Sequence, residues 1–317
     1  HLTCELLDRG HEVVVLDDLS GGFEENVDGR ASFTEGSIVD HELVDSLFDQ
    51  HRFDYVYHLA AYAAEGLSHF IRRFNYTNNL IGSVNLVNAA VRTHAKRFVF
   101  TSSIAVYGTG ELPLRESQTP RPEDPYGVAK LAVEQDLAAA HHMFGLEYTI
   151  FRPHNVYGEY QNLGDRYRNV VGIFMNLAMQ GKPLTVFGDG EQTRAFSYVG
   201  DVIPAIARSV EMPGAVNQIF NVGGDEVYSV NQLADTVLEV IGRADLGRRH
   251  VEARNEVLHA YSDHGKTHEV FGAPAPTSLE DGLAKMWAWA RERGVTRTGR
   301  FTDIELTEKL PASWLED

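Results

Sequence analysis

The 317-residue sequence predicts an α/β protein in which a doubly wound parallel sheet carries a smaller, interwoven α+β lobe. Short apolar runs alternate with helical segments through the first half of the chain, which is the pattern of strand–helix–strand units. A run that is apolar throughout is typical of a strand buried on both faces of a parallel sheet. After Arg152-Pro153 the rhythm breaks into loops rich in Gly, Asn and Tyr, and the second lobe begins there.

The elements of the first half follow in chain order. Residues 1–10 read as a helix with Leu2 and Leu6 on one stripe and Gly10 as its C-cap. Nothing in the sequence precedes this helix to dock it, so we expect that a strand and a glycine-rich turn before residue 1 are missing. The further predicted strands are 13–16, 55–59, 97–100 and 147–151, and the further predicted helices are 43–48, 78–93 and 126–144.

Fewer helices and strands are predicted in the second half of the sequence. A helix is expected at 172–180, a strand at 184–187 and a last helix at 279–293, before a polar tail. The sequence has no internal repeat and no low-complexity linker, so the two parts are expected to be interwoven. The expected division is one unit of residues 1–153 with returning segments near 195–222, and a second lobe of residues 154–194 and 223–317 that includes the tail.

The composition excludes several classes of partner. A net charge of −17 disfavours broad contact with nucleic acid or an anionic membrane, although a few local arginines can still bind a small anion. The single cysteine, Cys4, cannot form an internal disulfide, which fits a reducing cytoplasm. No apolar run approaches the ~20 residues that span a bilayer, and no signal peptide is visible. We therefore expect a cytoplasmic protein with no nucleic-acid partner and no membrane partner.

Asp17 stands where the first predicted strand ends. In a dinucleotide-binding strand–helix–strand unit, a carboxylate at this point accepts hydrogen bonds from both ribose hydroxyls and repels a 2′-phosphate, which favours NAD over NADP. A turn or N-cap aspartate is the alternative interpretation.

Tyr126 and Lys130 give the strongest chemical signal. Four residues apart on a helix, they share a face, which brings the ammonium near the phenol. Lowering the pKa of a tyrosine from ~10 to ~7 needs ~4 kcal/mol in favour of the phenolate. An exposed ion pair supplies only ~1 kcal/mol or less, whereas a partly buried lysine together with a positively charged nicotinamide ring can supply more. Because Tyr-x-x-x-Lys is common on helices by chance, the pair indicates a catalytic role only together with the residues around it.

The context is a row of hydroxyls. The apolar run 98–100 leads into Thr101-Ser102-Ser103, at the carboxyl end of a predicted parallel strand, where such sheets bind ligands. Ser103 is placed to hydrogen-bond the same substrate oxygen as Tyr126; an N-cap or a local turn is its alternative role. Ser103, Tyr126 and Lys130 together predict hydride chemistry on an alcohol.

The order of these motifs resembles the extended short-chain dehydrogenase/reductase family, and within it the UDP-galactose 4-epimerase group. The resemblance covers nearly the whole chain. It depends on Asp17-Asp18-Leu19, Glu35-Gly36-Ser37-Ile38, His58-Leu59-Ala60-Ala61, Asn78-Asn79-Leu80-Ile81-Gly82, Ser102-Ser103 with Tyr126 and Lys130, Arg152-Pro153-His154-Asn155-Val156-Tyr157-Gly158, and residues 187–194. Two positions depart from the family: Ser37 stands where Asp is usual, and His154 stands where Phe or Tyr is common.

The resemblance implies a Rossmann-type dinucleotide-binding domain in residues 1–153 and a substrate-binding second lobe. It implies an NAD site lined by Asp17, Asp18, Ser37, Ile38, Leu59, Ala60, Ala61, Asn78, Tyr126, Lys130 and His154. It implies sugar-nucleotide contacts from Ser103, Asn155, Asn169, Arg194, Arg254 and Tyr261. The two arginines would hold the diphosphate, a task that suits the planar guanidinium fork; a surface ion pair is the alternative for each.

Ile104 and Ala105 narrow the reaction. Related dehydratases and decarboxylases carry acids at these positions, and neither side chain here can transfer a proton. The resemblance then implies oxidation at C4, rotation of the keto sugar and return of the hydride to its other face, with Tyr126 as base and then acid and NAD retained. Tyr261 aligns with a residue that narrows the pocket beside the sugar C2 substituent, which favours UDP-glucose/UDP-galactose.

Other interpretations stay open. A UDP-glucuronate, pentose or N-acetylhexosamine epimerase, a sugar-nucleotide reductase, and a non-catalytic NAD- or sugar-nucleotide-binding regulator remain alternatives. No HExxH motif occurs, and His264 and His268 flank Gly265 in a loop-like stretch, so no metal is expected. Relatives commonly dimerise through the helices near 78–93 and 126–144, and a homodimer is expected on that ground.

Overall fold

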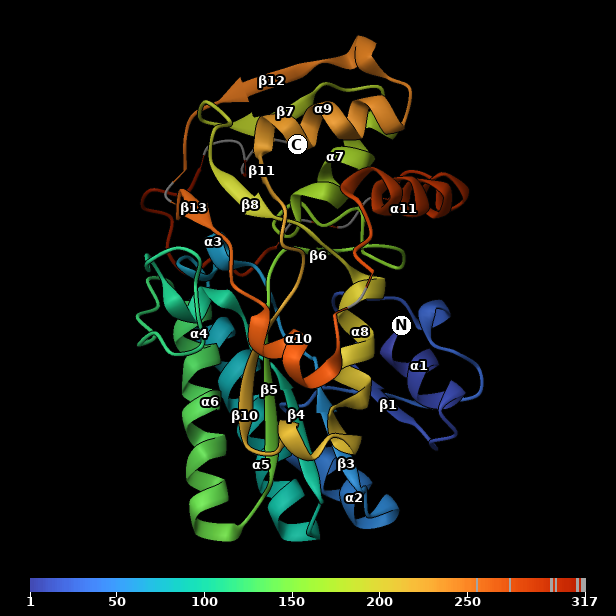
Figure 1. The fold of residues 1–317 in the computed structure, drawn as a ribbon, viewed down its shortest axis with the longest axis vertical. Coiled ribbons are helices and arrows are strands. Elements are labelled where there is room, and N and C mark those ends of the chain that lie inside the picture. Colours follow the sequence, from blue (N-terminus) through green and yellow to red (C-terminus); the bar gives the residue numbers. More distant parts are fainter. Residues whose placement is uncertain (255, 274, 297–298, 300, 312–313, 315–317) are drawn as a thin grey trace.

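The computed structural model shows an α/β unit below a second, smaller lobe (Figure 1). It describes all residues except 255, 274, 297–298, 300, 312–313 and 315–317. Four parallel strands of the lower unit lie in the order β10 (Gln218–Val222), β5 (Tyr148–Pro153), β4 (Arg97–Thr101) and β3 (Tyr55–His58). A second parallel pair is formed by β1 (Val14–Asp17) and β2 (Ser32–Glu35).

The predicted α/β class with parallel strands is therefore confirmed, but the strands form two sheets instead of one. Among the described residues, β1 and β3 share no ladder, so the β1–β2 pair is separate from the four-stranded sheet. The expectation of a further strand before residue 1 stays a prediction.

Helices cover both faces of the four-stranded sheet, and β4 shows this most simply. Phe98 and Phe100 pack on one face against α2, α5 and α6, while Val99, between them, packs on the other face against α1, α8 and α10. This alternation buries β4 on both sides, as its uninterrupted apolar run predicts. These helices are α1 (Leu2–Asp8), α2 (His41–His51), α5 (Gly82–Thr93), α6 (Pro125–Phe144), α8 (Val199–Arg208) and α10 (Gly265–Phe271).

Helix α6 has strong end signals. Asp124 accepts a hydrogen bond from the Gly127 backbone N–H at 2.8 Å, and Pro125 occupies the first helical position. At the other end Gly145 adopts φ +76°, a left-handed conformation that ends the helix. The predicted helix 126–144 is thus confirmed.

The predicted helix 78–93 begins later and differently. α5 follows a π-helical turn, η2 (Thr77–Ile81), which continues from α4 (Arg72–Tyr76). π-helical turns are rare and often lie at functional sites.

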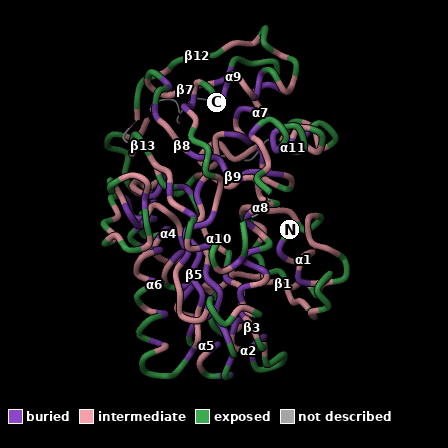
Figure 2. The backbone as a smooth tube through the Cα atoms, in the orientation of Figure 1, coloured by how far each residue is buried: buried purple, intermediate pink, exposed green. Residues whose placement is uncertain are grey.

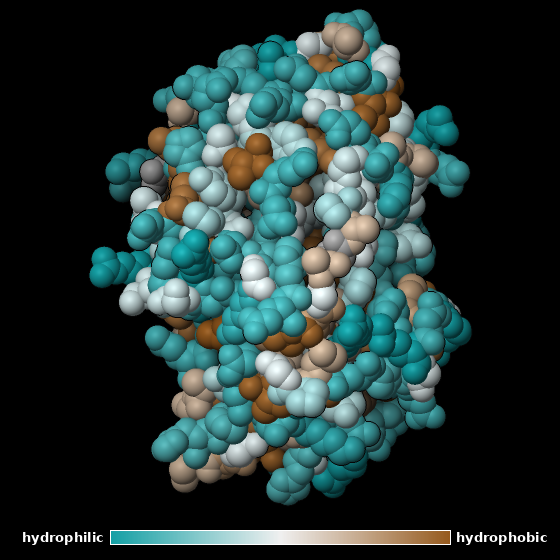
Figure 3. All heavy atoms as spheres, viewed as in Figure 1, coloured by the Kyte–Doolittle hydropathy of each residue, from teal (hydrophilic) through white to brown (hydrophobic). Residues whose placement is uncertain are grey.

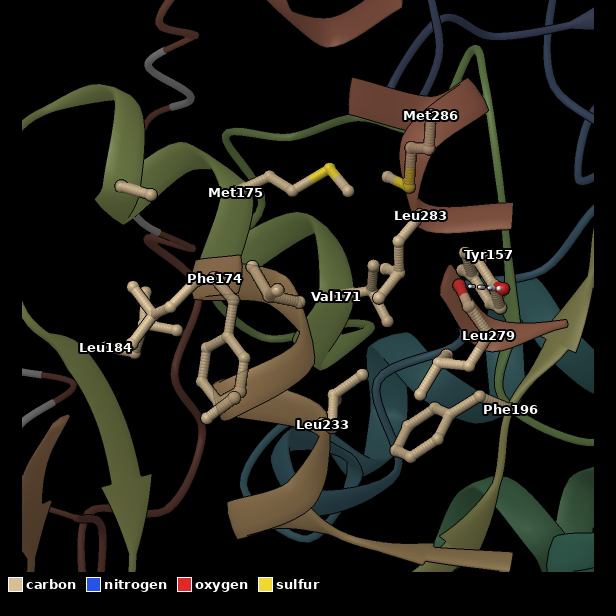
Figure 4. Packing of buried hydrophobic residues seen from close by; sticks show 14 of the residues in the cluster. Tyr157, Val171, Phe174, Met175, Leu184, Phe196, Leu233, Leu279, Leu283 and Met286 are labelled. Carbon is tan, nitrogen blue, oxygen red and sulfur yellow. Dashed lines mark hydrogen bonds between the residues drawn. The ribbon is translucent and has the colours of Figure 1, made fainter. Parts of the chain in front are cut away.

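The second lobe has its own small sheets and its own core. β11 (Val227–Ser229), β8 (Thr193–Ala195) and β13 (His259–Ala260) form one sheet, and β7 (Leu184–Phe187) pairs with β12 (Arg248–Val251). Figure 4 shows Phe174 and Met175 in one cluster with Leu233, Leu283 and Met286, and these residues come from three helices. These helices are α7 (Val170–Met179), α9 (Val230–Val240) and α11 (Leu279–Arg293).

Short elements connect the two parts. β6 (Val156–Tyr157) pairs with β9 (Ser197–Tyr198), so the chain passes between the parts more than once. The interior of both parts is buried in Figure 2, and the face seen in Figure 3 is mostly hydrophilic with small, scattered apolar groups. No helix in the described ranges is long and apolar enough to cross a membrane. The remaining short helices are η1 (Glu24–Asn26), α3 (Glu65–Ser68), η3 (Ile104–Tyr107), η4 (Ser209–Glu211), η5 (Pro213–Ala215) and η6 (Ala244–Leu246).

Candidate active site

Helix α6 presents Tyr126 and Lys130 to the carboxyl end of β4. The Lys130 ammonium donates a hydrogen bond to the Thr101 carbonyl oxygen at 2.8 Å and lies 5.8 Å from the centre of the Tyr126 ring. The structure therefore brings together the two side chains that the i, i+4 spacing placed on one face. The ring centre of Phe100 lies 4.7 Å from the ammonium.

Burial sets the protonation of both groups. Lys130 is 2% exposed, and desolvation lowers its pKa to about 7, with the Glu134 carboxylate partly opposing the fall. Desolvation raises the pKa of Tyr126, and the Ser103 hydroxyl opposes the rise. The protein by itself thus keeps the phenol protonated at neutral pH.

The neighbouring serines have different surroundings. The Ser102 hydroxyl donates to the Glu134 carboxylate at 2.5 Å and is buried. The Ser103 hydroxyl accepts a hydrogen bond from the Ala105 backbone N–H at 3.1 Å, capping η3, and is only partly buried. Ser103 therefore has the local capping role and also lies beside Tyr126.

A buried ion pair that sequence reasoning missed lies directly behind these serines. Arg152 donates to Glu134 from Nε at 2.9 Å and from Nη2 at 2.5 Å, with side chains 2% and 4% exposed. The guanidinium also lies over the Tyr107 ring, 4.7 Å from its centre. This pair joins α6 to β5. Arg152, a charged residue that directly follows Ile150-Phe151, was the available signal.

The two acidic residues after β1 lie in exposed turns. Asp17 accepts a hydrogen bond from the Leu19 backbone N–H at 2.7 Å, and Asp18 accepts one from Ser20 at 3.0 Å. The turn interpretation of Asp17 is therefore present in the structure, and its carboxylate remains exposed to solvent. After β2, the Ser37 hydroxyl accepts from the Val39 backbone N–H at 3.2 Å.

The loop after β3 contains Leu59, Ala60 and Ala61. Leu59 is 41% exposed, which leaves an apolar surface at the carboxyl end of the sheet. Asn79 fixes this loop: its side chain accepts from the Tyr62 backbone N–H at 2.8 Å and donates to the Tyr62 carbonyl at 3.1 Å. Asn78 instead donates to the Phe74 carbonyl in the helical turn that precedes it, at 2.9 Å. Of the two neighbouring asparagines, Asn79 is the one that reaches the loop.

Two arginines of the second lobe come together, as their expected shared role requires. Arg194 and Arg254 each lie 3.3 Å from the same Glu256 carboxylate oxygen, Oε2. Arg194 also donates to the Leu258 carbonyl at 2.9 Å, and Arg254 lies over the Phe187 ring. The carboxylate of Glu256 thus occupies a position between two guanidinium groups that suits an anion.

The other expected substrate residues make hydrogen bonds to the backbone. Asn155, at φ +40°, donates from Nδ2 to the Ala195 carbonyl at 3.1 Å. Asn169 caps α7 by accepting from the Val171 backbone N–H at 3.0 Å. Tyr261 is partly buried, and its carbonyl accepts from the Leu114 backbone N–H at 3.0 Å.

Glu65 is a further carboxyl that sequence reasoning missed. It begins α3, whose Ser68 hydroxyl accepts a hydrogen bond from the Tyr126 backbone N–H at 3.3 Å. Desolvation, and then the charge of Asp124, raise the pKa of the Glu65 carboxyl, although the residue keeps contact with solvent. Its charge in turn raises the pKa of Tyr126. An isolated acid after the apolar stretch 59–64 was the only signal.

The histidines considered for a metal have other contacts. His264 precedes α10 and hydrogen-bonds His154 and Asp225. Within the described ranges, no group of three or more His, Cys, Asp or Glu side chains is arranged to hold a metal ion.

Known proteins share this arrangement over nearly the whole chain. A UDP-glucose 4-epimerase of Mycolicibacterium smegmatis is 31% identical over 299 residues, covering 92% of this chain and 95% of that protein. The crystal structure of a Thermotoga maritima UDP-glucose 4-epimerase with UDP-glucose superposes with a TM-score of 0.86 at 33% identity, covering 92% of this chain and 95% of the other. A Bacillus cereus UDP-glucuronic acid 4-epimerase, solved with UDP-glucuronic acid and NAD, superposes with a TM-score of 0.84 at 26% identity, covering 92% and 95%.

A family model of nicotinamide enzymes matches residues 1–223, which include β1 to β10, Ser103, Tyr126 and Lys130. The chain therefore belongs to the NAD dependent epimerase/dehydratase family.

Proposed function

We propose that this enzyme is a sugar-nucleotide 4-epimerase of the UDP-glucose/UDP-galactose type. The observation that carries the proposal is the composition of the catalytic corner, where Tyr126 meets Ser103 and Lys130 beside Ile104 and Ala105. An alcohol can be oxidised and reduced there, while the two positions after Ser103 carry no proton-transfer group for elimination or decarboxylation.

The family's cofactor is NAD, and the chain fits it. Exposed Asp17 suits the ribose hydroxyls, the exposed apolar side chain of Leu59 offers a surface at the sheet edge, and Lys130 lies buried near the rings of Tyr126 and Phe100. The residues we assign to this site are Asp17, Asp18, Ser37, Ile38, Leu59, Ala60, Ala61, Asn78, Tyr126, Lys130 and His154. Bound NAD supplies a hydride acceptor, later a hydride donor, and a positive charge beside the phenol.

Tyr126, Ser103 and Lys130 have different roles in the proposed proton transfer. Tyr126 takes the proton of the sugar C4 hydroxyl and returns it after the keto sugar has turned over. Ser103 hydrogen-bonds the same oxygen and fixes its distance from the phenol. Lys130, held by the Thr101 carbonyl, stabilises the phenolate form through its positive charge. The buried position of Tyr126 excludes water from the transfer.

Substrate binding is assigned to the second lobe. Arg194 and Arg254 would hold the diphosphate in the place where Glu256 now lies, so the carboxylate must move aside when substrate binds. Asn155, Asn169 and Tyr261 complete the pocket, with Tyr261 beside the sugar C2 substituent. The relatives named for UDP-glucose, including one solved with it, support this substrate class.

Glu65 favours a second candidate. The charge of the Glu65 carboxyl acts on Tyr126, so this carboxyl is an acid from outside the motif around Ser103, and a reaction that needs an additional proton donor is the alternative. The two candidates differ in their products.

The experiment is a product analysis of the purified enzyme with NAD and a panel of UDP-sugars. Interconversion of UDP-glucose and UDP-galactose, resolved by chromatography and independent of added NADH, is the expected result. A dehydrated or decarboxylated product, or turnover that needs continual NADH, would overturn the proposal. Tyr126→Phe should bind UDP-sugar without turnover, which separates an enzyme from a regulator that only binds.

We also propose the division of labour between the parts. Residues 1–153 with the returning segments 195–222 form the dinucleotide-binding domain, and residues 154–194 and 223–317 form the substrate lobe. Pairing of two copies through α5 and α6 stays a prediction, which sedimentation of the purified protein checks.

A further inference from the structure

Two buried histidines from distant parts of the chain form a hydrogen-bonded chain. It ends at Ala195, next to the proposed substrate residues Arg194 and Asn155, which are here called the substrate arm. The Nε2 atoms of His154, after β5, and of His264, before α10, lie 3.0 Å apart. His154 Nδ1 lies 3.0 Å from the Ala195 carbonyl oxygen, and His264 Nδ1 lies 2.6 Å from the Asp225 carboxylate. Both histidines are 2% exposed, whereas the Asp225 side chain is 64% exposed.

The number of protons in this chain follows from its two ends. A carbonyl and a carboxylate only accept hydrogen bonds, so each outer nitrogen must carry a proton. The central Nε2–Nε2 contact needs one more. Three N–H groups are required, and two neutral imidazoles have only two. We propose that the His154–His264 pair carries one net positive charge at neutral pH and acts as a positioning device for the substrate arm.

The surroundings place the charge on His264. Its Nδ1 faces Asp225, and its Nε2 also lies 3.1 Å from the Ser262 hydroxyl, which can accept a hydrogen bond. Desolvation, and then the neighbouring charge of His264, lower the pKa of His154 to about 4, so His154 is the neutral ring.

Other ionisable groups lie on the elements packed around the pair. His268 lies one turn into α10, with its ring centre 6.3 Å from that of His264. The Asp263 carboxylate accepts a hydrogen bond from the Gly265 backbone N–H and pairs with Arg115. The Lys266 ammonium donates to the Ile219 carbonyl.

Two further charged groups lie near the ends of the histidine chain. Arg194 belongs to the strand that also carries Ala195, and Glu226 follows Asp225.

The chain ends at a carbonyl that the substrate arm shares. Ala195 follows Arg194 in β8, and its carbonyl accepts from both His154 and Asn155. The loop after β10 packs directly on His154, because a Cβ at Gly223 would collide with His154 Nε2 and Ser197 Oγ. When His264 is protonated, all three hydrogen bonds form and hold Arg194 and Asn155 in position. When His264 loses its proton, one of these hydrogen bonds is lost. This link to substrate rests on the proposed function.

The charged pair is tested first without substrate. Nitrogen-15 NMR of the full chain, labelled on histidine, reports the protonation of each ring nitrogen from about pH 6 to about pH 9. We expect three protonated nitrogens in the pair at the acid end and two at the alkaline end. Two protonated nitrogens throughout would overturn the proposal.

The link to substrate is tested by affinity for UDP. The dissociation constant should rise about tenfold as the pair loses its proton, which corresponds to about 1.4 kcal/mol. In Asp225→Asn the rise should move to lower pH, because the anion that stabilises the imidazolium is gone. In His264→Gln affinity should be weak and independent of pH, with KM raised and kcat within about twofold of wild type, as expected when only binding is lost.

His268→Gln is the matched control, because it removes a neighbouring histidine outside the chain and should leave the pH dependence unchanged. An unshifted pH dependence in Asp225→Asn would overturn the positioning role. If UDP does not bind at any pH, the proposed function fails, while the NMR result still decides the charged pair.

Discussion

Helix α6 carries two buried ionisable groups one turn apart. One of them is paired with an opposite charge, and the other is not. Glu134 lies against Arg152 with two hydrogen bonds and a third from Ser102. Lys130, four residues before it, is bonded to a neutral carbonyl and has a pKa lowered to about 7. Burial with a full set of partners yields a structural pair, whereas burial without a bonded counter-charge yields a group whose charge can change during a reaction.

The first prediction concerns the reacting end of this comparison. Tyr126→Phe removes the phenol oxygen while keeping the ring, so we expect turnover to fall by about 10²–10⁴-fold, the usual contribution of a general acid–base group. The melting temperature should stay close to that of wild type, because the apolar contacts of the ring remain. Turnover within tenfold of wild type would remove Tyr126 from the proton transfer.

The second prediction concerns the paired end. Glu134→Gln leaves the Arg152 guanidinium buried without its counter-charge, so we expect a loss of about 3–5 kcal/mol in the free energy of unfolding, measured by denaturant titration. The double variant Glu134→Gln/Arg152→Met should be more stable than Glu134→Gln alone, since no unpaired charge remains. Equal losses in both variants would show that the pair acts through packing instead of charge.

The third prediction tests the lowered pKa of Lys130 through the pH dependence of the free energy of unfolding. The folded-state pKa of Lys130, about 7, lies below the unfolded value, so between these values the unfolded chain binds more protons and stability rises with pH. The slope from this group should approach about 1.4 kcal/mol per pH unit between about pH 7 and about pH 10. Lys130→Met should lose this slope and be at least as stable as wild type at pH 6, while losing activity. An identical pH dependence in both proteins would contradict the lowered pKa.

The sequence predicted what depends on short-range patterns. The apolar run 98–100 predicted β4, and the predicted helix 126–144 corresponds to α6, so the relative placement of Tyr126 and Lys130 was predictable from their spacing. The π-helical turn at 77–81 was not predictable, because no residue type in it indicates a change from α-helical to π-helical hydrogen bonds. The split between β1 and β3 was likewise invisible, since strand order depends on contacts far along the chain.

The charged contacts of the site were the least predictable part. His154 and His264 are 110 positions apart and Arg194 and Glu256 are 62 apart, so only the fold shows that they meet. Glu134 is followed in the sequence by Gln135 and Asp136, so its position in α6 did not show that its side chain is buried. The identity of its partner, Arg152, required the register of α6 on β5.

The last prediction concerns Glu65, an exposed residue of α3 whose charge raises the pKa of the Tyr126 phenol. Its negative charge acts on Tyr126 and on Arg194 and Arg254. Glu65→Gln removes that charge at nearly constant shape. For an anionic substrate we expect KM to fall by about twofold, since a partly solvated like charge costs about 0.5 kcal/mol. The alkaline rise of the activity profile should also begin at slightly lower pH, because the pKa of the Tyr126 phenol falls. A large drop in kcat would instead show that the Glu65 carboxyl transfers a proton itself, and the comparison along α6 would then have to include a catalytic acid from α3.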